Sequence, residues 1–348
     1  MDIHLLTTRD YELDFLPMPC AMERCLPSHT TAGNSVQKGL VYLRTLAMIR
    51  QKIRSLHPDI VHLHVIKLPW LEQRLIKFIQ RNGAKCVMTM HDIFPHESDG
   101  PSPALRHCYD LLDGVALHAP ENAERFNQLC RPSARVQQAL IPHGDYEFLA
   151  HPIPTEQARA ALNISPTKKV LLFFGYIRKY KGLDILLQAL EQLVKTESDI
   201  LLLVAGKPHG ELTEYTDRIA AAGLAPNVRF ISEYIPMAHT GRYFSAADIV
   251  VLPYRKVDQS GVVPLAAAYR KPVVVTHVGG LSTQVNDGTT GRIVPPENPE
   301  KLAAAIRDML TGGELAAMGE ALYQSMHRHS SWAIVAQQYQ QFYQSVIQ

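Results

Sequence analysis

The sequence has 348 residues, of which 46% are hydrophobic and 20% charged, and its formal net charge is +2. This length suits two domains of about 150 to 180 residues, each able to bury a core. The nearly balanced charge argues against nucleic acid as the main partner. Five scattered cysteines without CxxC spacing indicate reduced thiols in a cytoplasmic protein rather than a disulfide framework or a zinc site.

The N-terminus has neither a basic segment nor a long apolar run, so the sequence predicts no signal peptide. The longest apolar runs, such as 200–205, have the length of a strand. A bilayer-spanning helix needs about 20 apolar residues. We therefore expect a protein that is soluble or at most bound to a membrane surface.

Short apolar runs alternate with longer amphipathic stretches along the chain. The runs lie at 59–64, 86–90, 114–117, 170–174, 200–205, 228–231, 249–252 and 272–275. They are continuous, as expected for parallel strands that are covered on both faces. The stretches at 40–56 and 183–194 carry apolar residues at helix spacing. This order predicts open α/β sheets with right-handed crossovers.

A stiff connector with the sequence HPIP at 151–154 marks a boundary between two halves. We place an N-terminal domain at 1–152 and a C-terminal domain at 153–325. The remaining segment, 326–348, is helical by pattern from Trp332 onward, and we expect it to pack back on the N-terminal domain.

Histidines follow the strands of the N-terminal half. His62 and His64 project to the same side of their strand. No acidic or cysteine ligand stands beside them, so we expect a packed or hydrogen-bonded pair rather than a metal site. His91 and His96 follow the strand that ends at Met90, on the side where open α/β sheets bind ligands.

A basic turn at 175–182 separates a strand from a helix in the C-terminal half. Arg178 and Lys181 could contact phosphate oxygens there, and Gly182 lets the backbone close in. Positive side chains and helix N-termini stabilise the charge of a nucleoside diphosphate that leaves a sugar. A solvated basic turn is the alternative interpretation.

A second candidate for phosphate binding is the loop at 258–262, with the sequence DQSGV, which precedes an alanine-rich helix. Ser260 is predicted as the N-cap, and Pro264 lies in the first turn, where proline is tolerated. The free backbone N–H groups could bind a phosphate. An ordinary capped helix start is the alternative.

Five segments carry a resemblance to a known family. They are FFGYIRKYKGLDILL at 173–187, AADIVVLPY at 246–254, QSG at 259–261, KPVVVTHVGGL at 271–281 and DGTTGRIVPPENPEKL at 287–302. In order and spacing they resemble the retaining glycosyltransferases of the GT-B fold, often called family four. The resemblance runs from about Asp59 to the C-terminus and implies two Rossmann-like domains whose parallel sheets face a central cleft.

The resemblance also implies roles for individual residues. The residues implied to bind the donor diphosphate are Arg178, Lys181, Gln259, Ser260 and Gly261. Those implied on the nucleotide or ribose side are Gly206, Tyr234 and Asp258. His91 is implied to contact the donor sugar near the reacting carbon, which makes it the catalytic candidate. Those expected on the acceptor side or at the cleft edge are His96, His143 and Gly144.

The sequence departs from the family pattern in the C-terminal half. The family has two glutamates separated by seven residues around the helix after the loop, and an alignment on Gly261 puts Asp258 and Ala266 in their places. Thr283 stands where a further glutamate is usual. Arg178 lies two residues beyond the usual arginine position. These changes put the strength of the donor site in question.

A further departure concerns the N-terminus. Family members open with a strand, a glycine-rich loop and a helix, whereas residues 2–7 resemble the second strand of that pattern. Either the start of the chain is assigned too late, or the N-terminal domain lacks its first strand, loop and helix, as the sequence suggests. Its sheet would then expose an unpaired strand edge.

By resemblance, the reaction is transfer of a sugar with retention of configuration, by attack of the acceptor hydroxyl on the face of the leaving diphosphate. Neither a metal nor another cofactor is expected; the donor is a nucleotide sugar of the UDP or GDP type. The acceptor is expected to be a glycan or a lipid-linked molecule of cell-surface polysaccharide synthesis. The protein is expected in the cytoplasm. Basic residues at 44–54 and 74–85 suggest peripheral contact with the inner face of the plasma membrane, and solvated helix faces are the alternative interpretation.

Two other interpretations of the function are left open by the sequence. A non-catalytic, glycosyltransferase-like protein for binding or assembly fits the missing glutamates and the missing N-terminal unit. Another GT-B enzyme, an epimerase or a phosphorylase, is less consistent, because neither catalytic carboxylates nor a pyridoxal lysine site stands out.

Overall fold

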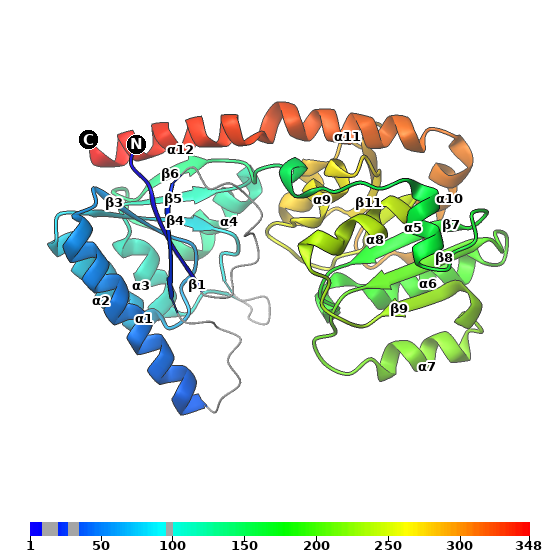
Figure 1. Ribbon diagram of the computed structural model, residues 1–348, viewed down its shortest axis with the longest axis horizontal. Helices are drawn as coiled ribbons and strands as arrows, with labels where there is room; N and C mark the ends of the chain where they lie inside the picture. Colours follow the sequence, from blue (N-terminus) through cyan, green and yellow to red (C-terminus); the bar gives the residue numbers. More distant parts are fainter. Residues whose placement is uncertain (9–19, 27–34, 95–99) are drawn as a thin grey trace.

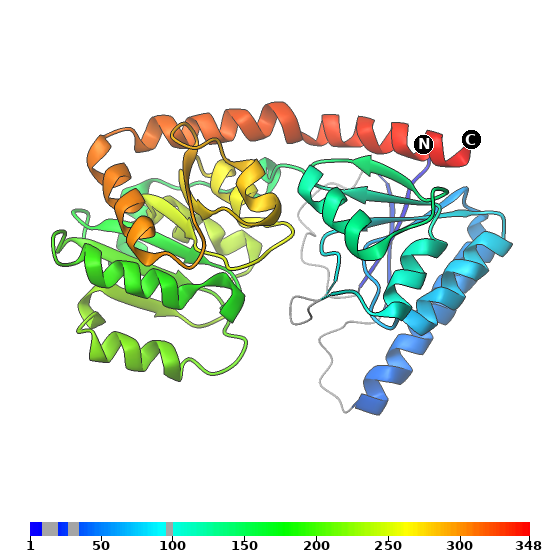
Figure 2. The same ribbon diagram turned by 180° about the vertical axis from the view of Figure 1, so that it is seen from behind.

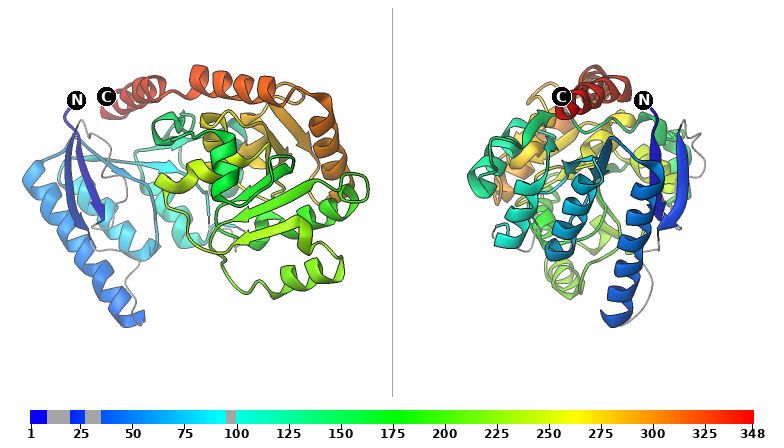
Figure 3. Two further views of the ribbon diagram at one scale, coloured as in Figure 1. Left: turned by 45° about the vertical axis from the view of Figure 1, so that its right-hand side comes forward. Right: turned by 90° about the vertical axis from the view of Figure 1, so that its left-hand side faces the viewer.

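The computed structural model describes residues 1–8, 20–26, 35–94 and 100–348 of the chain. Two lobes lie side by side, and α11 (Leu315–Ser330) and α12 (Trp332–Ile347) run along one edge of both (Figures 1 and 2). Both ends of the chain lie at the N-terminal lobe (Figure 3).

The C-terminal lobe is built on a parallel sheet with the strand order β12-β11-β10-β7-β8-β9. The strands are β7 (Lys169–Phe174), β8 (Ile200–Ala205), β9 (Val228–Ile231), β10 (Ile249–Leu252), β11 (Val273–Thr276) and β12 (Gly291–Val294). The order reverses beside β7, where β8 lies on one side and β10 on the other. A switch point of this kind is where doubly wound sheets bind ligands.

Helices cover both faces of this sheet. They are α5 (Thr155–Ala161), α6 (Leu183–Leu193), α7 (Thr213–Ala221), α8 (Thr240–Ala246), α9 (Val262–Ala268) and α10 (Pro299–Gly312). Leu171 and Phe173 of β7 pack in one core with α6 and α10, whereas Leu172 packs in a second core with α8 and α9. Burial on both faces explains why the strands read as continuous apolar runs.

Four parallel strands in the order β3-β4-β5-β6 form the larger sheet of the N-terminal lobe. They are β3 (Ile60–Leu63), β4 (Lys85–Met90), β5 (Gly114–Leu117) and β6 (Gln137–Leu140). The helices of this lobe are α1 (Ser35–Leu56), α2 (Pro69–Arg81), α3 (Pro103–Leu111) and α4 (Pro120–Cys130). Cys86, Met88 and Met90 of β4 pack toward these helices.

The C-terminal helix α12 covers the opposite face of that sheet. Its residues Val335, Phe342 and Val346 are buried against Val87 and Ala116. A Cβ on Gly114 would lie 2.8 Å from the Phe342 ring, so the small residue admits the helix. In the segment 326–348, predicted to be helical from Trp332 onward, α11 ends at Ser330 and α12 begins at Trp332.

The first strands form a sheet of their own. β1 (His4–Thr8) pairs in parallel with β2 (Ala21–Leu26), and the described strands β3 to β6 belong to a different sheet. In Figure 3 the pair runs alongside α1, and Lys52 of that helix forms an ion pair with Glu23 of β2.

The predicted α/β architecture with parallel sheets is confirmed. All five cysteines are free, as expected. Within the described residues, no helix combines the length and the apolar character needed to cross a bilayer.

Candidate functional site

The basic turn after β7 leads through a short 3-10 turn, η2 (Lys179–Lys181), into α6. Gly182 ends that turn with φ of 69°, and a Cβ there would overlap the carbonyl oxygen of Pro253. Glycine is therefore required both by the left-handed backbone and by the close approach of Pro253, which follows β10. Because the turn is constrained at Gly182, the position of Lys181, one residue earlier, is constrained as well.

The Lys181 side chain is buried, with only 8% of its surface exposed. Its Nζ lies 3.4 Å from the Phe174 carbonyl oxygen and 5.4 Å from the centre of the Tyr254 ring. Among the described residues no carboxylate forms an ion pair with it. Desolvation, aided by the charge of Arg178, lowers the pKa of Lys181 to about 8. A buried cation without a counter-charge is costly unless an anion binds to it.

Arg255 braces the turn that carries Lys181. Its Nη1 and Nη2 donate to the two carboxylate oxygens of Asp184 at 2.8 and 2.6 Å, and Nη1 also donates to the Lys179 carbonyl at 2.8 Å. Although desolvation opposes it, this pairing lowers the pKa of Asp184. A bidentate fork of this kind holds the turn in place independently of any ligand.

The neighbouring strand ends add backbone and aromatic surface. Gly206 follows β8, and a Cβ on it would overlap the carbonyl of Gly175, so glycine is needed for the two strand ends to meet. The exposed rings of Tyr176 and Tyr234 lie 6.3 Å apart, and the Arg178 guanidinium lies 5.9 Å from the Tyr176 ring. Gly206, Tyr234 and Arg178 are thus gathered around the carboxyl ends of β7 to β9.

The loop at 258–262 lies next to Lys181 through Tyr254. The Tyr254 ring faces the Lys181 ammonium, and the Ser260 side chain opposes the rise that burial causes in the pKa of Tyr254. The prediction of Ser260 as N-cap was wrong, since Gly261 occupies that position. The Ser260 hydroxyl instead accepts from the Val262 backbone N–H at 3.3 Å, which removes one of the predicted free donors. α9 is short because the loop is folded by these contacts before the helix begins.

Asp258 turns toward the N-terminal lobe. Its side chain pairs with Arg125 of α4 and accepts from the Ile93 backbone N–H at 3.0 Å. The Asn122 side chain donates to the Asp258 carbonyl at 3.0 Å. Only 4% of Asp258 is exposed. The structure therefore places this carboxylate at the contact between the lobes, although the resemblance implied a position beside the ribose.

A ladder of five histidines lines the carboxyl ends of β3 to β6; its members are His62, His64, His91, His118 and His143. The His91 ring hydrogen-bonds on one side to His64 and on the other to His118, each at 3.3 Å between nitrogens. His62 is hydrogen-bonded to Thr89 at 2.8 Å and to Tyr343 of α12 at 2.5 Å. The expectation of a hydrogen-bonded His62 is confirmed, and His62 and His64 stack at 4.7 Å.

These rings are neutral at physiological pH. Desolvation, together with the neighbouring imidazoles, lowers the pKa of His62 and of His91 to about 3. Desolvation also lowers the pKa of His118 to about 4, against the hydrogen bond that its Nδ1 donates to the Ile141 carbonyl. A neutral His91 can donate or accept a hydrogen bond but brings no positive charge.

Tyr146 connects the ladder to the loop of the C-terminal lobe. Its hydroxyl lies 3.4 Å from His143 Nε2, and a Cβ on Gly261 would lie 2.9 Å from that hydroxyl. Gly144, expected at the same edge, leaves room for the Trp332 ring of α12. The segment 143–146 thus links the histidines of the N-terminal lobe to the loop at 258–262 of the C-terminal lobe.

Two further histidines are His96, which the sequence predicted as a site residue, and His118, which it did not. His96 lies outside the described residues. His118 was not singled out from the sequence, yet it follows its strand as directly as His91 follows its own. The same signal, a histidine at the carboxyl end of a buried strand, could have identified it.

Residues 154–324 match the family described as Glycosyl transferases group 1. The C-terminal half of this chain belongs to that family. The match spans the whole six-stranded sheet of the glycosyl transferase half and includes both the turn with Lys181 and the loop with Gly261.

Characterised relatives extend the likeness toward the N-terminus. A D-inositol 3-phosphate glycosyltransferase of Catenulispora acidiphila is 30% identical over 273 residues, which is 72% of this chain and 64% of the relative. A lipopolysaccharide 1,2-N-acetylglucosaminetransferase of Salmonella typhimurium is 27% identical over 321 residues, or 87% of this chain and 77% of the relative. The chain spans only 64% and 60% of the first two inositol phosphate glycosyltransferases that it matches.

Solved structures show the same fold over both lobes. A sucrose-phosphate synthase of Thermosynechococcus elongatus superposes with a TM-score of 0.78 at 20% identity, over 99% of this chain and 88% of that one. Anabaena HepE in complex with UDP superposes with a TM-score of 0.74 at 19% identity, over 88% and 84%. The chain therefore has the GT-B fold, as predicted.

Proposed function

We propose that the chain transfers a sugar from a nucleoside-diphosphate sugar to an acceptor hydroxyl. The observation that carries this proposal is the buried Lys181 ammonium, which has no carboxylate partner among the described side chains and lies at the switch point of the sheet. A diphosphate supplies the missing negative charge. The family match and the likeness to HepE, whose structure was solved with UDP, support the same class of ligand.

In this proposal Arg178 and Lys181 bind the diphosphate from the β7 side, and Ser260 and Gly261 bind it from the α9 side. The ribose and base extend over Gly206 toward Tyr234. The Gln259 side-chain oxygen is buried and has no hydrogen-bond partner in the described part of the chain. In the proposal, a hydroxyl of the donor donates a hydrogen bond to it.

The proposed reaction retains the configuration of the sugar and needs no metal. Lys181 and Arg178 offset the charge that develops on the leaving diphosphate, as a metal does in other transferases. The acceptor hydroxyl attacks from the side of the leaving group, and a phosphate oxygen takes its proton. Neutral His91 exchanges one of its 3.3 Å hydrogen bonds to His64 and His118 for a sugar hydroxyl near the reacting carbon. Contact between the lobes limits entry of water.

The proposed acceptor is a glycan or a lipid-linked molecule of cell-surface polysaccharide synthesis, and the proposed location is cytoplasmic. One face of the N-terminal lobe favours contact with a membrane, because α1 exposes Leu40 and Leu43 and α2 exposes Trp70. Arg74 lies over the Trp70 ring. Apolar anchors among basic residues suit an anionic lipid surface. Flotation with anionic liposomes tests this contact, and a protein that stays at the bottom of the gradient disproves it.

Thermal denaturation in the presence of UDP, GDP or ADP tests the donor site. We expect one nucleotide to raise the melting temperature of the wild type and of Lys179→Ala, whose exposed side chain lies beside the site, but not of Lys181→Ala. The nucleotide that raises the melting temperature identifies the base of the donor. If none of the three changes the melting temperature of the wild type, the proposal is wrong.

That negative outcome would favour a second function, a non-catalytic binding or assembly protein with the glycosyltransferase fold. The pairing of Asp258 with Arg125 supports this alternative, because the carboxylate is held away from a ligand. Ala266 is buried and offers no carboxylate in its place. Release of free sugar or transfer to an acceptor from a bound nucleotide sugar would exclude the alternative.

A further inference from the structure

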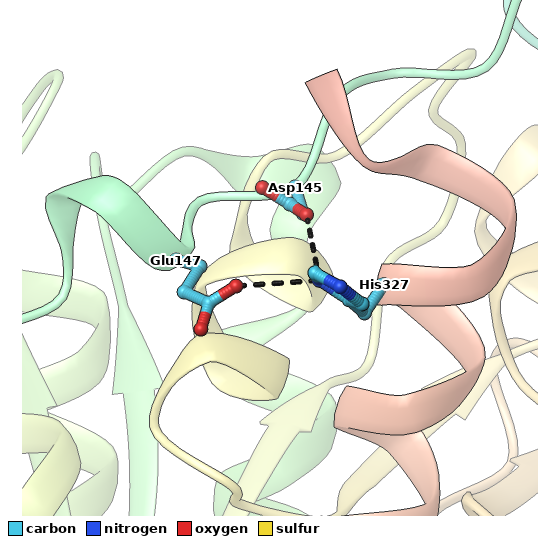
Figure 4. A group of neighbouring side chains, drawn as sticks. All are labelled: Asp145, Glu147 and His327. Carbon is cyan, nitrogen blue, oxygen red and sulfur yellow. Dashed lines mark ion pairs between the residues drawn. The ribbon is translucent and has the colours of Figure 1, made fainter. Parts of the chain in front are cut away.

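The segment that joins the lobes meets α11 at a group of three metal-ligating side chains. Asp145 and Glu147 come from the segment between β6 and α5, and His327 comes from α11 (Figure 4). One potential ligand atom of each residue lies within 4.8 Å of the others. His327 Nδ1 is 3.3 Å from Glu147 Oε2 and 3.7 Å from Asp145 Oδ2.

The distances suit a shared ion. Ligand atoms about 2.0 to 2.2 Å from a metal lie roughly 3 to 3.5 Å from one another in a tetrahedral arrangement. The observed separations between the imidazole nitrogen and the carboxylate oxygens are close to this range. Small rotations of the partly exposed Glu147 and His327 side chains would complete it.

Hydrogen bonds to neighbours hold the Asp145 backbone and the Glu147 side chain. The Asp145 N–H donates to the Ser330 carbonyl at 2.9 Å, and its own carbonyl accepts from the Trp332 indole at 2.9 Å. The Tyr323 hydroxyl donates to the other oxygen of Glu147 at 2.7 Å. Such outer contacts orient ligands before a metal binds.

The local charge also favours a cation. Asp145 is 9% exposed, and its carboxylate and that of Glu147 have His327 as their sole ionic partner among the described residues. Apolar side chains lie beside the group, among them Pro264, Ala267 and Met326. Two carboxylates facing one imidazole in such surroundings leave an uncompensated negative charge.

We infer that Asp145, Glu147 and His327 bind a divalent transition-metal ion of the zinc class. Imidazole nitrogen and carboxylate oxygen are both ligands that zinc accepts, and water would fill the remaining position. The ion would tie the segment between the lobes to α11. It plays no part in the chemistry of the donor site, so the inference does not depend on the proposed function.

The position of the ion suggests what it stabilises. Tyr146 lies between the two carboxylate residues and reaches His143 and Gly261. A metal that fixes the backbone on both sides of Tyr146 would also fix the contact between the histidine ladder and the loop of the C-terminal lobe. The ion would thus stabilise the arrangement of the two lobes.

The test is calorimetric titration of zinc chloride into the full chain after treatment with a chelator. Wild type and His329→Ala should each bind one equivalent at this site, because His329 is an exposed histidine on the same helix that points elsewhere. Affinity should fall at least about tenfold in His327→Ala and in Glu147→Gln. Glu147→Gln changes an exposed side chain and keeps its shape, so its melting temperature without zinc should match the wild type.

The histidine ladder is the competing zinc site, and the titration separates the two. If zinc binding persists in both His327→Ala and Glu147→Gln but disappears in His91→Ala, the ion binds the ladder and the inference is wrong. Absence of binding to the wild type would also overturn it. Replacement of zinc by cobalt gives a second readout, since the visible spectrum of the bound cobalt should change in Glu147→Gln and not in His329→Ala.

Discussion

The two lobes use the same strand-helix repeat, but they differ in how their sheets are completed. The C-terminal lobe has one continuous sheet with a buried core on each face. The described strands of the N-terminal lobe are divided between two sheets, and one face of the larger sheet depends on α12 from the far end of the chain. The C-terminal lobe is therefore the more self-sufficient of the two.

The two lobes also differ in the charge of the side chains at their strand ends. The C-terminal lobe presents a buried cation, Lys181, whereas the N-terminal lobe presents a ladder of neutral imidazoles. A cation suits an anionic diphosphate, and neutral hydrogen-bonding groups suit sugar hydroxyls. The contrast teaches that one fold, used twice, can supply two halves of a site with opposite electrostatic character.

The largest expected effect comes from Gly182→Ala in the C-terminal lobe. The added Cβ would overlap the Pro253 carbonyl while φ stays in the left-handed region, so we expect a loss of at least about 2 kcal/mol in stability. Chemical denaturation measures it. Gly312→Ala is the control, since a Cβ there meets no neighbour, and it should leave stability unchanged or slightly higher.

The next effect concerns the contact between the lobes. Arg125→Ala leaves the buried Asp258 without its cation, which should cost about 1 to 3 kcal/mol and lower the melting temperature by several degrees. Scanning calorimetry measures the change. Glu124→Ala, one position earlier on α4, is the control and should change little. A melting temperature unaffected by Arg125→Ala would show that the lobes are held by other contacts.

The histidine ladder predicts loss of stability in mild acid. In the folded protein the pKa of His62 and of His91 is about 3, below the ordinary value of 6.5. The unfolded chain therefore binds more protons as the pH falls below about 6.5, and the stabilising contribution of the neutral rings is lost from there downward. Melting temperatures between pH 7.5 and pH 5 should fall, and less steeply in His62→Gln. Equal slopes for both proteins would contradict this assignment.

The smallest effect should appear in hydrogen exchange. An isolated two-stranded sheet is only marginally stable, so amides of β1 and β2 should exchange faster than those of β4 or β7. Mass spectrometry of peptides after brief exchange measures this difference. Protection of β1 and β2 equal to that of β7 would mean that their pairing is reinforced by contacts beyond those described.

Periodicity and apolar runs predicted most of the fold. The runs at 170–174, 200–205 and 249–252 became β7, β8 and β10, because burial on both faces leaves a strong local signal. The turn with Lys181 was equally visible, since basic residues and a glycine stand together between strand and helix. These features depend on neighbours in sequence.

Features that depend on distant neighbours were not predicted. The pairing of Asp258 with Arg125 and the grouping of Asp145 with His327 join residues far apart in the chain. Such contacts arise only when the lobes and α11 are in place.

The most direct test of the central claim, that Lys181 binds the diphosphate, is calorimetric binding of one nucleotide in three forms. The nucleoside, the monophosphate and the diphosphate of the stabilising base are titrated into wild type, Lys181→Ala and Lys179→Ala. We predict that Lys181→Ala weakens diphosphate binding at least about tenfold and leaves nucleoside binding unchanged, while Lys179→Ala behaves as wild type. Equal weakening of all three forms, or of none, would contradict the account.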